Sequence, residues 1–463
     1  MEWSGSGTVD SPVFTQQSEV KSRPAIFLCI LNNFLFFVCK ILKLNKQIDS
    51  FIIFLAIFLS ADGVFDMYME SEVIDYVNEE DVKFIRLAYF DLSGKQRNVS
   101  IMAGELPRAF KEGISFDASA IPGFQEAHSS DLFLHPDPST LSVIPWRPST
   151  GKVVRMFCDI KYPDGTPYEK DCRHILKQAV KKAKDEFGIE FKFGTEFEFY
   201  LFKLDENGRN TKIPFDNAGY MDIAPEDKGE NIRREIDFTL EQMGITPEFS
   251  HHEEGPGQNE IDFRASDAET AADNASTFKW IVRTKAASNG LYADFSPKPL
   301  SVYPGNGMHI NISANKEEKM PAIMAGILAH LSEITYFLNP SEESYSRIGQ
   351  SKAPKFICWG TQNRSCAIRV PSKHPNGKIQ IRSSDSECNI YLAFTLLIYA
   401  ALDGIKKNLV PEPAVQENLF QSYAEDNKDY EERTKNYRTI PLSLAEARKL
   451  AEESEFIKQI IKF

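Results

Sequence analysis

The chain has 463 residues, which is too long for one simple core and therefore predicts two domains. Hydrophobic residues make up 42% and charged residues 26%, as in an ordinary globular protein. The net charge of −13 argues against general nucleic-acid binding, which needs a basic surface. The seven cysteines are odd in number and include no CxxC pair. We therefore expect free thiols in a reducing, cytoplasmic setting and no catalytic cysteine.

Residues 1–66 differ in character from the rest of the chain. They hold two apolar runs, Ala25–Leu42 and Phe51–Leu59. The first is interrupted by polar residues, and the second has about half of the ~20 residues that a spanning helix needs. Acidic residues precede the first run, whereas a signal peptide would begin with basic ones. We expect this segment to lie outside the working fold, with Met67 or Met69 as the natural first residue; a membrane anchor is the alternative.

Residues 67–165 are predicted to form a small, mostly β domain, and residues 166–463 a larger one. Strands are expected at Val82–Phe90, Gln96–Ile101 and Val153–Ile160, the first two joined by a turn. Apolar residues at helical spacing predict helices in the larger domain. These strands and long helices together indicate an α+β fold. The helices are expected at Asp171–Phe187, Gly229–Met243, Ala268–Ala287, Met320–Leu338, Tyr391–Ile405 and Leu442–Ile461, the last with Ser443 as its cap.

The segment 191–202 alternates strictly between apolar and polar residues, which is typical of a strand with one buried face. Its phenylalanines and Leu201 occupy the odd positions, and Glu196 and Glu198 share the opposite face. Two carboxylates side by side repel each other unless a cation lies between them. A metal ion is therefore the first hypothesis for this pair.

A second acidic segment, His251–Phe263, contains the tight turn Gly255-Pro256-Gly257 between two short predicted strands. Glu253 precedes the turn, and Glu260 follows it on the same face as Gln258 and Asp262. A hairpin of this kind would bring Glu253 and Glu260 together as two further oxygen ligands. The alternative is an acidic surface hairpin without a ligand.

Polar and cationic side chains follow in three more stretches. His309, Asn311 and Ser313 share one face of a predicted strand that begins after a glycine-rich bend. A single histidine is more often structural, but the place of His309 at the start of this polar face, just after the bend, favours contact with a ligand or substrate; a structural role is the alternative. Two further segments carry Arg364 and Arg369, and then Lys378, Gln380 and Arg382 in alternation; taken alone, each is compatible with a solvated basic rim.

Arginines beside a carboxylate cluster favour phosphoryl transfer, because the acids hold a divalent metal and the arginines neutralise phosphate charge. Carboxylate oxygens with one imidazole suit Mg²⁺ or Mn²⁺. There is neither a GxxxxGKS loop nor a Rossmann glycine pattern, so a nucleotide would be held in another way.

These segments, in this order, resemble the glutamine synthetase family in its bacterial-type form, from about residue 80 to the C-terminus. The resemblance implies an N-terminal β-grasp domain, a C-terminal catalytic α/β domain and a homo-oligomer, a dodecamer in this family. It also implies the ATP-dependent ligation of ammonia to L-glutamate through a γ-glutamyl phosphate. The matching motifs are Phe116–Ile121, Glu196–Glu198, His251–Glu260, Gly305–His309, Asn363–Pro371 and Tyr391–Phe394.

The resemblance also assigns roles to individual residues. It implies two Mg²⁺ or Mn²⁺ ions per site, the first held by Glu198, Glu253 and Glu260, the second by Glu196, His309 and Gln380. It places Gly305, Arg347 and Arg382 at the glutamate and phosphate, with Arg347 and Arg364 among the catalytic residues. The ATP side would comprise Ser313, Arg364, Arg369 and Lys378. Asp117 matches the acid that draws ammonium into a neighbouring subunit's site.

Two positions depart from the family pattern. Gln380 stands where relatives carry a glutamate, so the second ion should bind more weakly. Lys352 stands where relatives carry a glutamate in a flap over the ammonium site, and a cation there would repel ammonium. The resemblance as a whole still predicts glutamine synthetase activity, with no nucleic-acid or membrane partner. The alternatives are a γ-glutamyl ligase that uses another amine and a catalytically impaired homologue with a binding or structural role.

Overall fold

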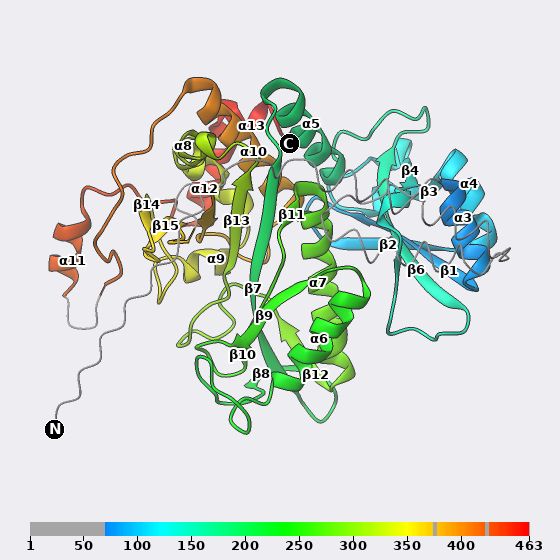
Figure 1. The fold of residues 1–463 in the computed structure, drawn as a ribbon, viewed down its shortest axis with the longest axis horizontal. Helices are drawn as coiled ribbons and strands as arrows, with labels where there is room; N and C mark the ends of the chain where they lie inside the picture. Colours follow the sequence, from blue (N-terminus) through cyan, green and yellow to red (C-terminus); the bar gives the residue numbers. More distant parts are fainter. Residues whose placement is uncertain (1–69, 374–376, 422–425, 463) are drawn as a thin grey trace, which may run out of the picture. The chain divides into compact units, whose positions relative to one another are not determined.

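The computed structural model describes residues 70–373, 377–421 and 426–462 (Figure 1). The predictions for residues 1–66 lie outside this part of the chain. Two large hydrophobic cores form within it, one built mainly from residues 73–168 and one mainly from residues beyond 172. The α+β prediction is confirmed, whereas the domain boundaries at 67–165 and 166–463 stay a prediction.

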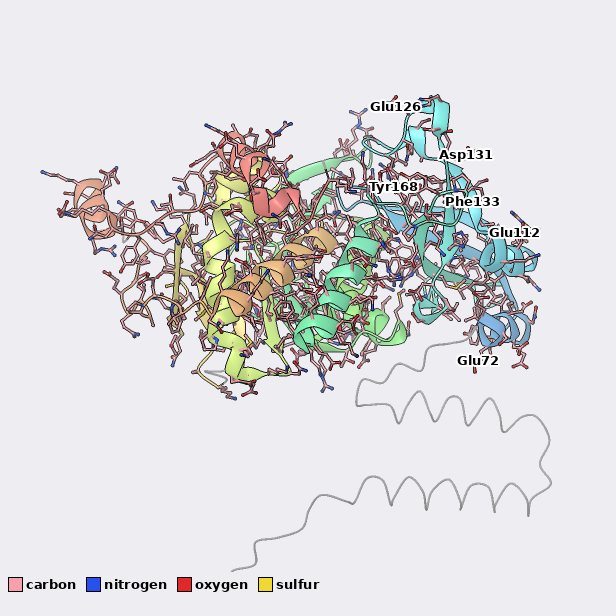
Figure 2. The ribbon with its side chains drawn as sticks, turned by 90° about the horizontal axis from the view of Figure 1, so that it is seen from above. Glu72, Glu112, Glu126, Asp131, Phe133 and Tyr168 are labelled. Carbon is pink, nitrogen blue, oxygen red and sulfur yellow. The ribbon has the colours of Figure 1, made fainter. Side chains whose placement is uncertain are left out.

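The first core lies under a six-stranded sheet with the order β2-β1-β6-β4-β3, to which β5 adds at β6. The predicted hairpin is present, because Phe84 to Phe90 of β1 pair antiparallel with Met102 to Gln96 of β2. Tyr168, labelled in Figure 2, is fully buried in this core. The strands are β1 (Val82–Phe90), β2 (Gln96–Met102), β3 (Ile114–Asp117), β4 (Asp131–Pro136), β5 (Ser142–Val143) and β6 (Lys152–Lys161), beside helices α3 (Glu70–Glu79) and α4 (Leu106–Glu112).

The second core lies under a ten-stranded sheet with the order β14-β15-β16-β13-β7-β10-β9. Its centre is β7 (Phe191–Leu204), whose length lets it pair additionally with β8, β11 and β12. Figure 1 shows β7 and β13 side by side. The other strands are β8 (Asn210–Pro214), β9 (Pro247–His252), β10 (Gln258–Phe263), β11 (Ser266–Asp267), β12 (Leu291–Asp294), β13 (Met308–Ala314), β14 (Phe356–Thr361), β15 (Cys366–Val370) and β16 (Ile379–Ile381).

Five of the six helices predicted in the second domain are present, and side-chain caps mark where two of them begin. Asp171 accepts a hydrogen bond from the Arg173 backbone at the start of α5 (Cys172–Phe187), and Asn389 caps α10 (Ile390–Lys407). Gly326 and Gly404 let α8 (Met320–Leu338) and α10 touch, because a Cβ on either residue would lie 2.1–2.2 Å from a carbonyl oxygen of the other helix. The remaining helices are α6 (Glu230–Gln242), α7 (Ala268–Ser288), α9 (Glu342–Arg347) and α11 (Asn427–Thr434).

The prediction of one final helix over Leu442–Ile461 is wrong. The segment forms α12 (Leu444–Glu453) and α13 (Glu455–Lys458), separated by Ser454 in an extended conformation. The Ser454 hydroxyl accepts from the Ile457 backbone and donates to Glu333 of α8, so it begins a second helix instead of continuing the first. Ser443 caps α12, as predicted.

Two further sequence-based expectations concern thiols and membranes. The cysteines in the described part of the chain, at 158, 172, 358, 366 and 388, are all free and buried. Among the helices described, one segment, Glu317–Leu338, has the length and apolarity of a membrane span, but 56% of its most apolar stretch is buried in the fold, where α8 packs as a core helix.

Candidate active site

The polar face of the ten-stranded sheet gathers side chains from five adjacent strands, β15, β16, β13, β7 and β10. On β7 the alternation holds, since Phe197 and Phe199 are buried in the core and Glu196 and Glu198 point away from it. The strand register sets these acids beside partners on both sides: His309 and Asp262 flank Glu196, and Glu260 lies opposite Glu198. Gln380 of β16 pairs with Asn311 of β13 on one side and with Arg369 of β15 on the other. Side chains from segments far apart in sequence therefore lie next to one another on neighbouring strands.

Glu196 accepts hydrogen bonds from three side chains. The Asn311 and Gln380 amides each donate to its Oε1 at 2.7 Å, and His309 Nδ1 donates to its Oε2 at 3.0 Å. Burial alone would raise the pKa of Glu196, but the bonds from His309 and Asn311 and the charge of Arg382 lower it to about 2. Burial and the charge of Arg382 lower the pKa of His309. Its Nδ1 carries a proton, because the Glu196 carboxylate that faces it can only accept.

Glu198 of β7 and Glu260 of β10 lie in a different environment from Glu196. Glu198 accepts from the Gly307 backbone at 2.8 Å and from Gln258 Nε2 at 3.3 Å, yet burial and the repulsion of Glu253 raise its pKa. Burial and then the charges of Asp262 and Glu198 raise the pKa of Glu260 well above its ordinary value. These carboxylates thus disfavour one another's charged forms.

Two residues that were not assigned to the site join this group. Ligand atoms of His251, Glu253 and Glu260 lie within 4.8 Å of one another, as do oxygens of Glu196, Glu260 and Asp262. Asp262 is 4% exposed, and its Oδ1 is buried without a hydrogen-bond partner. The alternation in Gln258–Phe263 placed Asp262 on the correct face, but only the pairing with β7 brings it to Glu196.

The donor set on this side fits a divalent cation. It offers the buried carboxylate of Glu260, the half-buried carboxylates of Glu198 and Glu253, the imidazole of His251 and the unpartnered oxygen of Asp262. Hard oxygen donors with one imidazole suit Mg²⁺ or Mn²⁺, and a cation would offset the repulsion that raises the pKa values of Glu198, Glu260 and Asp262. The structure thus brings together all the residues that were predicted to hold the first ion.

Gln380, predicted as a ligand of the second ion, is oriented differently. Its amide nitrogen donates to Glu196, and its amide oxygen accepts from Arg369 Nη1 at 3.2 Å and from Arg382 Nη1 at 3.1 Å. The oxygen that would ligate a cation therefore faces two guanidinium groups.

The predicted glutamate contacts lie next to the acids. Arg347 is 3% exposed, and its Nη2 donates to the carbonyl oxygens of Ser383 and Ser384. Its Nε is buried without a partner. Gly305 packs so closely that an added Cβ would lie 2.2 Å from the Pro297 carbonyl and 2.7 Å from Arg347 Cγ, so only glycine fits there.

The residues predicted on the ATP side follow the edge toward β15. The last paired residues of β13 and β16 are Ile312 and Ile379. Ser313 follows Ile312 and Lys378 precedes Ile379, and both side chains are half-buried. Arg364 lies exposed in the loop before β15, and its carbonyl accepts from Arg382 Nε at 3.2 Å.

Asp117 is placed elsewhere, at the end of β3 in the six-stranded sheet. Its carboxylate is exposed and accepts from the Ser119 backbone and hydroxyl. The structure does not join Asp117 to the acids of the ten-stranded sheet, and its predicted role in a neighbouring subunit stays a prediction.

Lys352, the second departure from the family pattern, forms an ion pair with Glu254, the residue after Glu253. Its Nζ also lies 5.8 Å from the ring centroid of Tyr220. This ion pair links the loop around Lys352 to the segment just before the Gly255–Gly257 turn, which also contains Glu253.

Comparison with known families finds two adjoining matches. Residues 81–163 match the β-grasp domain of glutamine synthetase, and residues 169–462 match its catalytic domain. Among curated proteins, the chain is 41% identical over 409 residues to the glutamine synthetase of Methanosarcina mazei, which covers 85% of this chain and 90% of that protein. The Clostridium saccharobutylicum enzyme is 40% identical over 411 residues, covering 85% and 91%.

Solved structures show the same fold. A GmaS/ADP complex superposes with a TM-score of 0.75 at 26% identity, covering 84% of this chain and 91% of that one. Plasmodium falciparum glutamine synthetase superposes with a TM-score of 0.73 at 24% identity, covering 85% and 94%.

Proposed function

Because the chain belongs to the glutamine synthetase family, we propose that it is a glutamate–ammonia ligase, which uses ATP to join ammonia to the side-chain carboxylate of L-glutamate. One observation carries this activity beyond the family resemblance. The buried acids of β7 and β10 and the arginines of β15 and β16 lie on one face of the same sheet, where Gln380 joins them.

Two groups of side chains would act on the phosphate groups: the carboxylates through a bound cation, and the arginines directly. Glu198, Glu253 and Glu260 would hold a divalent cation, which would supply positive charge against the phosphate groups of the nucleotide. Arg369 and Arg382 face the same site, where their guanidinium groups can bind the transferred phosphoryl group as it moves from ATP to the substrate carboxylate.

Arg347 is suited to hold the substrate rather than the nucleotide. Its Nη2 is fixed by two backbone carbonyls, which leaves a buried and immobile guanidinium beside Gly305. Such a group can bind a carboxylate of glutamate without losing side-chain entropy. Ammonia would then attack the acyl phosphate, and phosphate would leave.

The finer assignments remain part of this proposal. They comprise the ATP contacts of Ser313, Arg364 and Lys378, Mg²⁺ or Mn²⁺ as the ion, a homo-oligomer with twelve subunits in which Asp117 serves a neighbouring site, and a cytoplasmic location. An exposed Asp117 at a strand end is compatible with service in another subunit.

The test is phosphate release by the purified protein with Mg²⁺, ATP and glutamate. We expect release that depends on ammonium, and a fall of at least about 100-fold in Glu198→Gln, which removes a buried acid of the site. Glu206→Gln is the matched control, because Glu206 is exposed in the turn after β7 and should leave the rate unchanged. Absence of ammonium-dependent release would reject the proposal.

The Lys352–Glu254 pair favours a second candidate, a γ-glutamyl ligase that uses another amine. By the resemblance, Lys352 adjoins the ammonium site, and its charge would disfavour a small cation there. The same assay with an amine panel separates the two, since release with amines alone indicates this activity. Binding of ATP without release under any condition would instead indicate an impaired homologue with a binding role.

A further inference from the structure

Gln380 lies between two arginines and an acid, and every polar atom of its amide is used. It is 3% exposed, so bulk water cannot replace a lost partner. Its nitrogen donates to Glu196, and its oxygen accepts from both Arg369 and Arg382. These donors and acceptors match on both sides, which fixes the orientation of the amide.

Rotating the amide to offer its oxygen to a cation near Glu196 would reverse both matches. The NH₂ group would then face the guanidinium groups of Arg369 and Arg382, donor against donor, in a buried site. Glu196 would also lose one of its three hydrogen bonds. Gln380 therefore does not suit the role of a metal ligand.

His309, the other neutral residue expected around a second ion, is also turned toward Glu196, and so is its strand neighbour Asn311. His309 directs its Nδ1–H and Asn311 its amide to the two oxygens of that carboxylate. Together with Gln380, they surround Glu196 with donors from three neighbouring strand positions. Glu198 has one such side-chain donor, Gln258 Nε2 at 3.3 Å, besides the Gly307 backbone, and Asp262 Oδ1 has no hydrogen-bond partner.

We propose that each subunit binds one divalent cation, on the side of Glu198, Glu253 and Glu260, and that Gln380 takes the place of the second ion by linking Arg369 and Arg382 to Glu196. This inference concerns the number of metal ions in the proposed active site, and it rests on the proposed ligase function. The two arginines then supply, as fixed groups, positive charge that a second ion would otherwise bring to the phosphates.

The test is a count of bound Mn²⁺ per subunit by electron paramagnetic resonance, on the full chain without nucleotide. We expect one Mn²⁺ in the unaltered protein and two in Gln380→Glu, whose carboxylate would face Glu196 across a vacated position. The added charge should tighten the second Mn²⁺ by about tenfold or more. Gln459→Glu is the matched control, because Gln459 is exposed at the end of α13 and its replacement should leave the count at one.

Three outcomes would overturn the inference: two Mn²⁺ of similar affinity in the unaltered protein, no Mn²⁺ in that protein, or a count that stays at one in folded Gln380→Glu. The count on the unaltered protein decides the matter even if that variant does not fold. Because the readout is metal content, a chain that binds one Mn²⁺ but releases no phosphate would reject the proposed activity and leave this inference standing.

Discussion

Two clusters of buried acids adjoin the β9–β10 hairpin, and they differ in their balance of charge. In the first, Asp216 accepts from His252 Nε2 at 2.9 Å, and Asp227 forms a two-pronged pair with Arg233 at 2.6 and 3.2 Å. Burial would raise the pKa of Asp216, but the hydrogen bond and charge of His252 lower it, and the same contact raises the pKa of His252. Each acid of this cluster has a cationic partner.

In the second cluster, the acids of the candidate site, the nearest basic group is more distant: His251 lies 3.9 Å from Glu253 and from Glu260. The pKa values of Glu198, Glu260 and Asp262 are all raised, first by burial and then by neighbouring acids. Both clusters place possible ligand atoms within 4.8 Å, so spacing alone does not tell a metal site from a structural network. The difference in charge does, because only the second cluster gains from a cation.

The largest effect is expected where the balanced cluster loses its cation. Arg233→Met leaves the buried Asp227 with the Gly229 backbone N–H but without its cationic partner, so we expect a loss of about 3–5 kcal/mol in the free energy of unfolding. The loss should appear in urea denaturation of the metal-free protein.

The neighbouring Arg234→Met is the matched control, since Arg234 is exposed on the same helix and its loss should change stability by less than about 0.5 kcal/mol. Equal effects of the two substitutions would show that charge compensation does not distinguish this cluster.

The opposite sign is expected where the unbalanced cluster loses an acid. The pKa of Glu260 is raised in the folded state, which therefore binds more protons than the unfolded state above about pH 4, so its contribution to stability falls as pH rises. Glu260→Gln removes this penalty. Without divalent metal it should stabilise the protein by about 1 kcal/mol at pH 7, and by less near pH 4.

Urea denaturation at both pH values measures this difference, with Glu241→Gln as the exposed control on α6. Added Mn²⁺ should stabilise the unaltered protein more than Glu260→Gln. A variant that is destabilised at pH 7 without metal would contradict the assignment of Glu260 to an uncompensated cluster.

Local patterns were sufficient to predict the positions of Glu196, Glu198, Glu253 and Glu260, because strand alternation and a glycine-proline turn depend on neighbours in sequence. The same holds for the helices α5 and α10, which begin at the capping residues Asp171 and Asn389. The fold class and family followed from these segments in their order.

The features that local pattern could not predict depend on residues far away in the chain. The final helix is interrupted where Ser454 meets Glu333, 121 positions earlier, and the orientation of Gln380 is fixed by Glu196, 184 positions earlier. Asp262 joined the site only through its pairing with β7. Sequence pattern gives the face on which a residue lies, but not the donors and acceptors that surround it.

The smallest effect is expected at Lys352, where charge is balanced without burial. Lys352 and Glu254 expose 62% and 31% of their side chains, so water screens the pair and little is gained from forming it. We expect Lys352→Ala to lower the free energy of unfolding by less than about 1 kcal/mol, and the effect to vanish at high salt. Urea denaturation at low and high ionic strength measures both. A loss as large as that of Arg233→Met would mean that the pair is shielded from solvent, and burial would then no longer separate structural from solvated charge in this protein.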